Sequence, residues 1–179
     1  MSRGPSRLAV LAAAVLVMSG CGYSLAGRGS FLPAYIETIG VPTFENSTSI
    51  FNLETEITQK VRSEFIGRGR YQIVPDETDV DAVLTGEVTS VDVQASSFTG
   101  QTIASSYTVT LRARVELRDA TDDRILWENP RLVFRQEYDA QSGDSVFDAA
   151  AILGQDAPAY DRITTDFARS VVSAILEAF

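Results

Sequence analysis

The stretch YTVTLRARVELR (residues 107–118) alternates apolar and polar side chains without a break. The apolar positions are Tyr107, Val109, Leu111, Ala113, Val115 and Leu117, and the polar ones are Thr108, Thr110, Arg112, Arg114, Glu116 and Arg118. A period of two is typical of a β-strand with one buried and one solvated face. The pattern therefore predicts a strand within an antiparallel sheet that has one open face.

The preceding strand shows the same alternation with one irregularity. Apolar residues take alternate positions from Ala82 to Val88, and they resume one position out of phase at Val91. A slip of one position inside a long strand predicts a β-bulge. The segment 97–102 (SFTGQT) is then a hairpin connection into the central strand.

The following strand comes after the turn DATDD (119–123) and runs over 124–138. Its apolar phase changes at Pro130, which has no N–H to donate to the ladder, so a second bulge is predicted there. We expect the nearby Trp127 to lie in the core rather than to anchor a partner.

The first part of the domain has a strand–helix–strand pattern. The strand over 34–44 places Tyr35, Ile39 and Val41 on one face and closes at Pro42. A helix and a second strand over 70–74 (RYQIV) follow after short joins. This order predicts a βαβ unit in which the two strands are parallel.

The helix of this unit is indicated by apolar residues three or four positions apart, up to about Ile66. These residues are Ile50, Leu53, Ile57, Val61 and Phe65. The N-cap candidates are Asn46, Ser47, Thr48 and Ser49, and the glycines expected to stop the helix are Gly67 and Gly69.

A second helix is predicted at the end of the chain, after a polar loop over 139–157. It occupies 157–179 with Pro158 in its first turn, and its apolar positions are Tyr160, Ile163, Phe167, Val171 and Ile175. We therefore expect an α+β fold, a two-layer sandwich with two helices packed on one face of a mixed, mostly antiparallel sheet. The element order is strand, helix, four strands, helix.

The first twenty residues resemble a secretory signal peptide. Arg3 and Arg7 precede an apolar run that is shorter than the roughly 20 residues needed to span a bilayer. The run ends in Met18-Ser19-Gly20-Cys21, which resembles the bacterial lipobox. The resemblance implies that Cys21 becomes the N-terminus and carries acyl chains.

The expected domain organisation follows from this cleavage. Residues 1–20 are the signal peptide, 21–33 a lipidated tether rich in Gly and Ser, and 34–179 a single domain. No Asp follows the cysteine, and the lipoprotein resemblance then implies the periplasmic face of the outer membrane. More than one acyl chain is needed for a stable anchor.

The composition disfavours several function classes. The net charge is −9, and loss of the leader with its two arginines makes it more negative, which argues against nucleic-acid binding. The chain has no histidine and one cysteine, so it lacks Ser-His-Asp and Cys-His catalysis and His-based zinc sites. The acidic segment 75–81 lacks the glycine and distal Glu of a calcium loop, so we expect a solvated turn. We expect no catalytic residue, no metal and no cofactor beyond the acyl chains.

Several segments in order resemble the LptE family of lipopolysaccharide (LPS) assembly lipoproteins. They are CGYSLAG (21–27), IGVPTFENSTS (39–49), LETEITQKVRSEF (53–65), DAVLTGEVTSV (81–91), YTVTLRARVELRD (107–119) and ILWE (125–128). The resemblance implies an outer-membrane lipoprotein that plugs the large β-barrel LptD in a one-to-one complex. It also implies assistance in barrel folding and in delivery of LPS to the cell surface.

Two alternatives remain open. VPTFEN (41–46) also resembles the first strand of outer-membrane lipoproteins that activate peptidoglycan synthases or serve curli-type secretion. Such an activator generally has a longer tether than 21–33, which favours the barrel partner. The second alternative is a carboxylate-dependent hydrolase, for which the sequence offers only scattered acids.

The outward face of the last hairpin collects arginines in an acidic protein. They are Arg112, Arg114, Arg118, Arg131 and Arg135. The expected neighbours are Arg118 with Arg124, Arg114 with Glu128 and, beyond the bulge, Arg112 with Arg131. Either Glu116, Glu128 and solvent neutralise these arginines, or the face binds lipid A and core phosphates of LPS, which guanidinium groups match in bidentate fashion.

Overall fold

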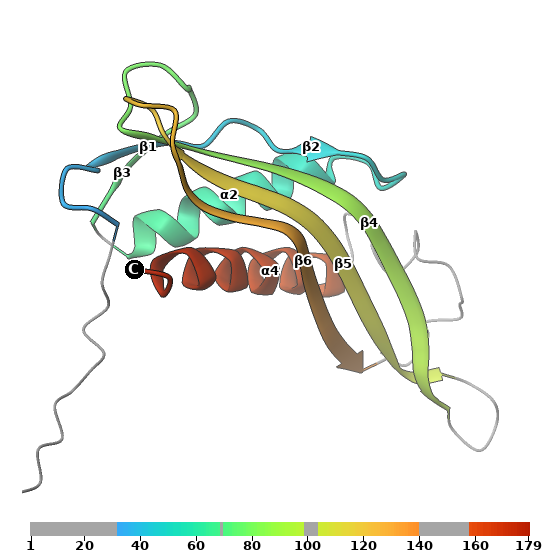
Figure 1. The fold of residues 1–179 in the computed structure, drawn as a ribbon. Coiled ribbons are helices and arrows are strands. Elements are labelled where there is room, and N and C mark those ends of the chain that lie inside the picture. The colour runs from blue at the N-terminus through green and yellow to red at the C-terminus, as the bar shows by residue number, and fades with distance from the viewer. Residues whose placement is uncertain (1–31, 69, 99–103, 140–157) are drawn as a thin grey trace, which may run out of the picture.

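The computed structural model describes residues 32–68, 70–98, 104–139 and 158–179. The strands are β1 (Thr38–Gly40), β2 (Glu45–Asn46), β3 (Gln72–Val74), β4 (Ala82–Phe98), β5 (Ala104–Asp119) and β6 (Ile125–Asp139). The helices are α2 (Leu53–Gly67) and α4 (Pro158–Leu176). Figure 1 shows the two helices side by side beneath one face of the sheet. The predicted α+β fold is therefore confirmed.

The sheet contains both parallel and antiparallel pairs. The strand order is β3-β1-β4-β5-β6, and β2 pairs with β4 beyond the end of β1. β1 is parallel to β3 and to β4, and β2 is parallel to β4, whereas the β4–β5 and β5–β6 pairs are antiparallel. The parallel pair of the strand–helix–strand unit and the antiparallel hairpins were both predicted.

Both predicted bulges are present. Val88 pairs with Ala113 and Ser90 with Arg112, so β4 has one extra residue at Thr89. On β6, Asn129 pairs with Val115 and Leu132 with Ala113, so the extra residue lies at Pro130–Arg131. Each bulge restores the apolar side chains to the inner face after the phase slip.

The core lies between the inner face of the sheet and the two helices. All six apolar positions of 107–117 are buried, as are the stripe residues that lie within the two helices, while Ile50 lies before α2 and is partly buried. Phe134 of β6 meets Phe167 of α4 edge to face with ring centroids 5.9 Å apart. Trp127 is partly buried against this core, as predicted.

The two helices run parallel to one another. Lys60 on α2 contacts Asp161 near the start of α4 at 2.5 Å. Arg68, the residue after the end of α2, donates to Ser173 near the end of α4 at 3.0 Å. The sequence pattern contains no information on this direction, because each stripe needs only an apolar surface to pack against.

The predictions for the first strand and the first helix need correction. Tyr35 is 50% exposed and Ile36 is buried in its place, because the chain turns at 34–35 and is not a strand there. The helix begins at Leu53, with Asn52 in the left-handed region (φ 61°) and no side-chain cap. The predicted cap Asn46 instead holds the preceding turn, donating from Nδ2 to the Ile50 carbonyl at 2.8 Å.

The acidic segment 75–81 crosses over the end of β1. A Cβ at Gly40 would stand 2.3 Å from the carbonyl oxygen of Asp76, so only glycine fits beneath this crossing. The carboxylate of Asp81 accepts hydrogen bonds from the N–H groups of Glu37 and Thr38 at 2.9 and 2.8 Å. The segment is therefore a structural crossover between β3 and β4.

Several expectations lie outside the described residues: the leader with Cys21, most of the tether, the helix stop Gly69, most of the 97–102 connection and most of the 139–157 loop. Within the described ranges, no helix has the length and apolarity needed to cross a bilayer.

Candidate binding face of the sheet

The face of the sheet opposite the helices carries the predicted arginines. Arg112, Arg114 and Arg118 take alternate outward positions on β5, while the apolar residues between them are buried. Arg131 and Arg135 lie on β6, at and beyond the bulge. The structure therefore places all five arginines on two neighbouring strands.

Each of the three β5 arginines has an acidic partner. Arg112 pairs with Asp92 of β4, and Arg114 pairs with Glu87 of β4 at 2.6 Å. Arg118 pairs with Glu116 on its own strand and with Asp123 in the turn, at 2.9 Å for the latter. These carboxylates raise the pKa of Arg118, with the hydrogen bond to Glu116 as the largest cause.

These ion pairs are solvent-exposed. The side chains of Arg112 and Asp92 are 46% and 48% exposed, and that of Arg114 is 63% exposed. Pairs of this kind contribute about 0–1 kcal/mol each to stability. They therefore set the local charge of the face more than they hold the fold together.

The arginine register differs from the expectation. Arg112 lies opposite Val133 and not Arg131, because the turn and an irregularity at Leu117/Arg118 each add one residue on the β6 side beyond the predicted bulge. Arg118 lies opposite Ile125 and not Arg124, because the turn is one residue longer than expected and the Asp119 N–H donates to the Arg124 carbonyl. Glu116 and Glu128 face each other directly, an arrangement of like charges that the Arg118 partner of Glu116 offsets.

The two β6 arginines differ from those of β5. Among the described residues, neither Arg131 nor Arg135 forms an ion pair, and both side chains are exposed. Arg131 takes part in the bulge through its backbone N–H, which donates to Asn129 Oδ1 at 3.2 Å. Arg135 reaches a hollow of about 480 Å³ that it shares with Arg112, Thr108 and Thr110.

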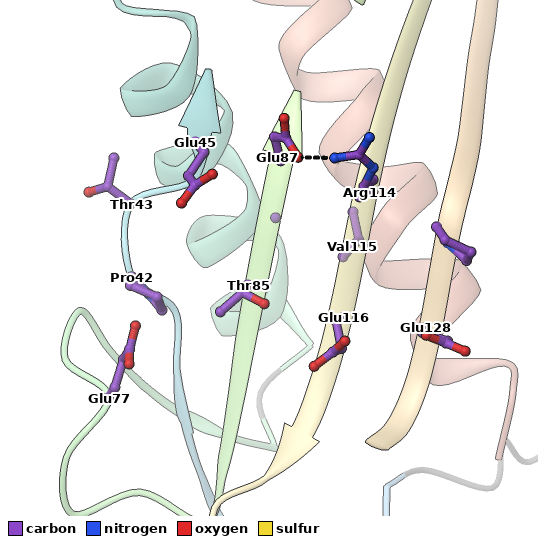
Figure 2. Close-up of a pocket in the computed structure, with 12 residues that line it drawn as sticks. Pro42, Thr43, Glu45, Glu77, Thr85, Glu87, Arg114, Val115, Glu116 and Glu128 are labelled. Carbon is purple, nitrogen blue, oxygen red and sulfur yellow. Dashed lines mark hydrogen bonds and ion pairs between the residues drawn. The ribbon is translucent and has the colours of Figure 1, made fainter. Parts of the chain in front are cut away.

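A groove of about 350 Å³ opens on the same face, across β4, β5 and β6 beside the bulge at Pro130 (Figure 2). Its lining is Pro42, Thr43, Glu45, Glu77, Thr85, Gly86, Glu87, Arg114, Val115, Glu116, Glu128 and Pro130. Figure 2 shows Pro42 and Glu77 on one side and Glu116 and Glu128, from β5 and β6, on the other. Glu45, Glu77 and Glu128 have no basic partner among the described residues, so the groove is acidic.

At the far end of the long strands, three side chains from three strands meet. Ser96 of β4 and Ser106 of β5 both donate to Glu137 Oε1 of β6 at 2.7 Å. These hydrogen bonds stabilise the carboxylate and lower the pKa of Glu137, that from Ser106 being the largest cause. Glu137 is therefore held as an anion next to the arginine hollow.

The described residues contain no group of three or more His, Cys, Asp or Glu side chains arranged to hold a metal ion. Ion pairs, hydroxyl groups and shallow hollows dominate the outer face, and they suit contact with a polar surface. Fold and face together define a small α+β domain whose open sheet face is charged and hydroxyl-rich.

A comparison with protein families identifies the family of this domain. The model of the LptE family, described as lipopolysaccharide-assembly, matches residues 36–175. The chain belongs to the LptE family and is a lipopolysaccharide-assembly lipoprotein.

Solved structures share the fold at low sequence identity. Protein CT253 from Chlamydia trachomatis is 8% identical with a TM-score of 0.54, covering 78% of this chain and 95% of that one. A PelC dodecamer from Paraburkholderia phytofirmans is 13% identical with a TM-score of 0.50, covering 84% and 96%. Protein XCC0632 from Xanthomonas campestris is 13% identical with a TM-score of 0.50, covering 80% and 85%. At these identities the likeness shows the fold alone, and the curated proteins yield no match.

Sequence reasoning missed the acidic partners on β4. Glu87 and Asp92 lie on the outward side of β4, one before and one after its bulge. The β5 residues that they face therefore depend on the position of the extra residue in β4. The bulge was predicted, but the register that brings Glu87 opposite Arg114 also depends on where the strands are connected and on two further shifts near Ser97. The groove had no such signal, because Pro42 and Glu77 reach it from distant segments.

Proposed function

We propose that this protein is an outer-membrane lipoprotein subunit of the LPS translocon, anchored through acyl chains on Cys21. It plugs the lumen of an LptD-like β-barrel in a one-to-one complex and assists assembly of that barrel. The observation that carries the proposal is the LptE family match over residues 36–175.

The physical character of the sheet's outer face supports this role. Lumens of outer-membrane barrels are lined by polar side chains, and the outer face presents paired charges and hydroxyl groups with most of its apolar residues turned inward. The tether adds a geometric argument, since the stretch from Cys21 to Leu32 spans at most about 40 Å when fully extended. A domain on so short a tether meets partners in or at the same membrane.

The second part of the proposal is contact with LPS through the arginine face. Arg112, Arg114, Arg118, Arg131 and Arg135 are the proposed contacts to lipid A and core phosphates. Arg131 and Arg135 bind phosphate without first releasing a carboxylate, since no described acid pairs with them. Arg112, Arg114 and Arg118 must exchange an existing partner for the phosphate.

Extraction from outer membrane in mild detergent tests the barrel partnership. The tagged full-length protein should co-purify with one large barrel at equal stoichiometry, as an obligate subunit does. Recovery of free monomer, with a peptidoglycan synthase retained in its place, would instead support the activator alternative.

A further inference from the structure

The strand β6 lies at one end of the strand order, so no described strand pairs with its outer edge (Figure 1). A long open edge exposes unpaired N–H and C=O groups and can accept another strand. Most edge strands are short or interrupted, which prevents this pairing. The edge of β6 therefore raises the question of what pairs with it.

The interruption on β6 covers only its first part. Pro130 and the bulge disturb the ladder between Asn129 and Leu132. From Leu132 to Asp139 the pairing with β5 continues without any register shift. This second part is therefore a regular edge that carries no proline.

The side chains along this regular part alternate between the two faces. Leu132, Phe134 and Tyr138 are buried, and Phe134 contacts Phe167 of α4. Val133 points to the outer face and is 55% exposed. The inward side chains of β6 therefore contact the helix layer, whereas Val133 is exposed to solvent.

Two exposed cations flank Val133 on the outer face. Arg131 and Arg135 form no ion pair with described residues, in contrast to the three arginines of β5. The outer face thus presents a cation, an apolar residue and a cation at alternate positions. Cross-strand pairs of opposite charge and of apolar residues stabilise an adjacent strand.

We propose that this β6 edge, the backbone of 132–139 with the side chains of Arg131, Val133 and Arg135, receives an extended segment of a partner protein by β-strand addition. The segment carries carboxylates opposite the two arginines and an apolar residue between them. Backbone hydrogen bonds provide the affinity and the alternating side chains provide the specificity. The proposal does not depend on the barrel, and it engages Arg131 and Arg135, which are also among the proposed LPS contacts.

A second copy of this chain fits the edge less well. An antiparallel pair centred on Val133 would place Arg131 opposite Arg135 of the second copy, and like charges directly opposite are unfavourable. A register that pairs Arg131 with Glu137 competes with the two serine hydroxyl groups that already bind Glu137.

The test uses the full-length protein in detergent and the fluorescein-labelled peptide Thr-Glu-Thr-Val-Thr-Glu-Thr. Fluorescence anisotropy should show binding, and Arg131→Gln with Arg135→Gln should weaken it about tenfold. The matched control Arg169→Gln, an exposed arginine on α4, should leave the affinity unchanged. Replacing both peptide glutamates by glutamine should also weaken binding.

Two N-methylated peptides separate strand addition from simple charge attraction. Alternate residues of a strand direct their N–H groups to opposite edges, so methylating the threonines blocks one edge and methylating the other residues blocks the opposite edge. One of these peptides should bind like the parent, and the other should lose about tenfold or more. Equal affinity of both, absence of parent binding, or dimerisation of the protein through β6 in sedimentation would each overturn the proposal.

Discussion

The ring of Phe44 lies directly over Gly86, so that a Cβ on Gly86 would stand 2.4 Å from the ring carbon Cε2. Phe44 is only 3% exposed, and its backbone N–H donates to the Thr58 hydroxyl on α2 at 2.9 Å. The contact joins the segment after β1, the strand β4 and the helix α2. It also lies beneath the acidic groove, which Gly86 helps to line.

Gly86→Ala should destabilise the domain by about 1–3 kcal/mol, because the buried ring cannot move aside without strain. Urea unfolding of the variant measures the loss, with Thr85→Ala on the same strand as the control. Combining Gly86→Ala with Phe44→Leu should recover part of the loss, since the two sites are coupled. Additive effects of the two substitutions would show that the overlap is relieved elsewhere.

Tyr35 and Asp119 should give the domain a pH-dependent contribution to stability. The Tyr35 hydroxyl donates to Asp119 Oδ2 at 2.5 Å, and this bond is the largest cause of the lowered pKa of Asp119. A lowered carboxyl pKa contributes stability above the unfolded pKa of about 3.9 that is lost as the pH falls through the folded pKa.

Tyr35→Phe should therefore unfold at lower urea concentration than the parent at pH 7, and the difference should shrink as the pH falls below the folded pKa of Asp119. In an Asp119→Asn background the same substitution should have little pH-dependent effect. A Tyr35→Phe penalty that stays constant from pH 7 to acid would mean that the carboxylate is not its partner.

The arginines without acidic partners should contribute most to LPS binding. Replacing Arg131 and Arg135 by Gln should weaken binding about five- to tenfold, or about 1–1.4 kcal/mol, and flatten its salt dependence. Asp92→Asn should strengthen binding, since it releases Arg112 from its carboxylate. Surface plasmon resonance over a salt series provides the measurement, and identical slopes for all variants would assign the face to solvent alone.

Cys21→Ala should leave a longer precursor without acyl chains, because the lipobox resemblance makes Cys21 the site of processing. Intact-mass measurement and membrane fractionation would show the unprocessed mass and the loss of stable anchoring. Ser19→Ala, which keeps a small residue in the lipobox, is the matched control and should be processed normally. A normal acylated mass for Cys21→Ala would place the anchor elsewhere.

The sequence by itself determined the elements of this protein that depend on local periodicity. The alternation over 107–117 specified which side of β5 is buried, and the phase slips near Thr89 and Pro130 located both bulges. These predictions succeed because a two-residue period maps each side chain onto one face, whatever the rest of the chain does.

Only the tertiary structure decided how these elements meet. The parallel direction of α2 and α4, the partners Asp92 and Glu87 of the arginines, and the contact between Phe44 and Gly86 all join residues far apart in the chain. Each depends on register and on the packing of whole layers, where one residue added in the turn and one added after Leu117 moved the partner of Arg112 from Arg131 to Val133. Long-range neighbours follow from the sum of such shifts, and local pattern has no information about that sum.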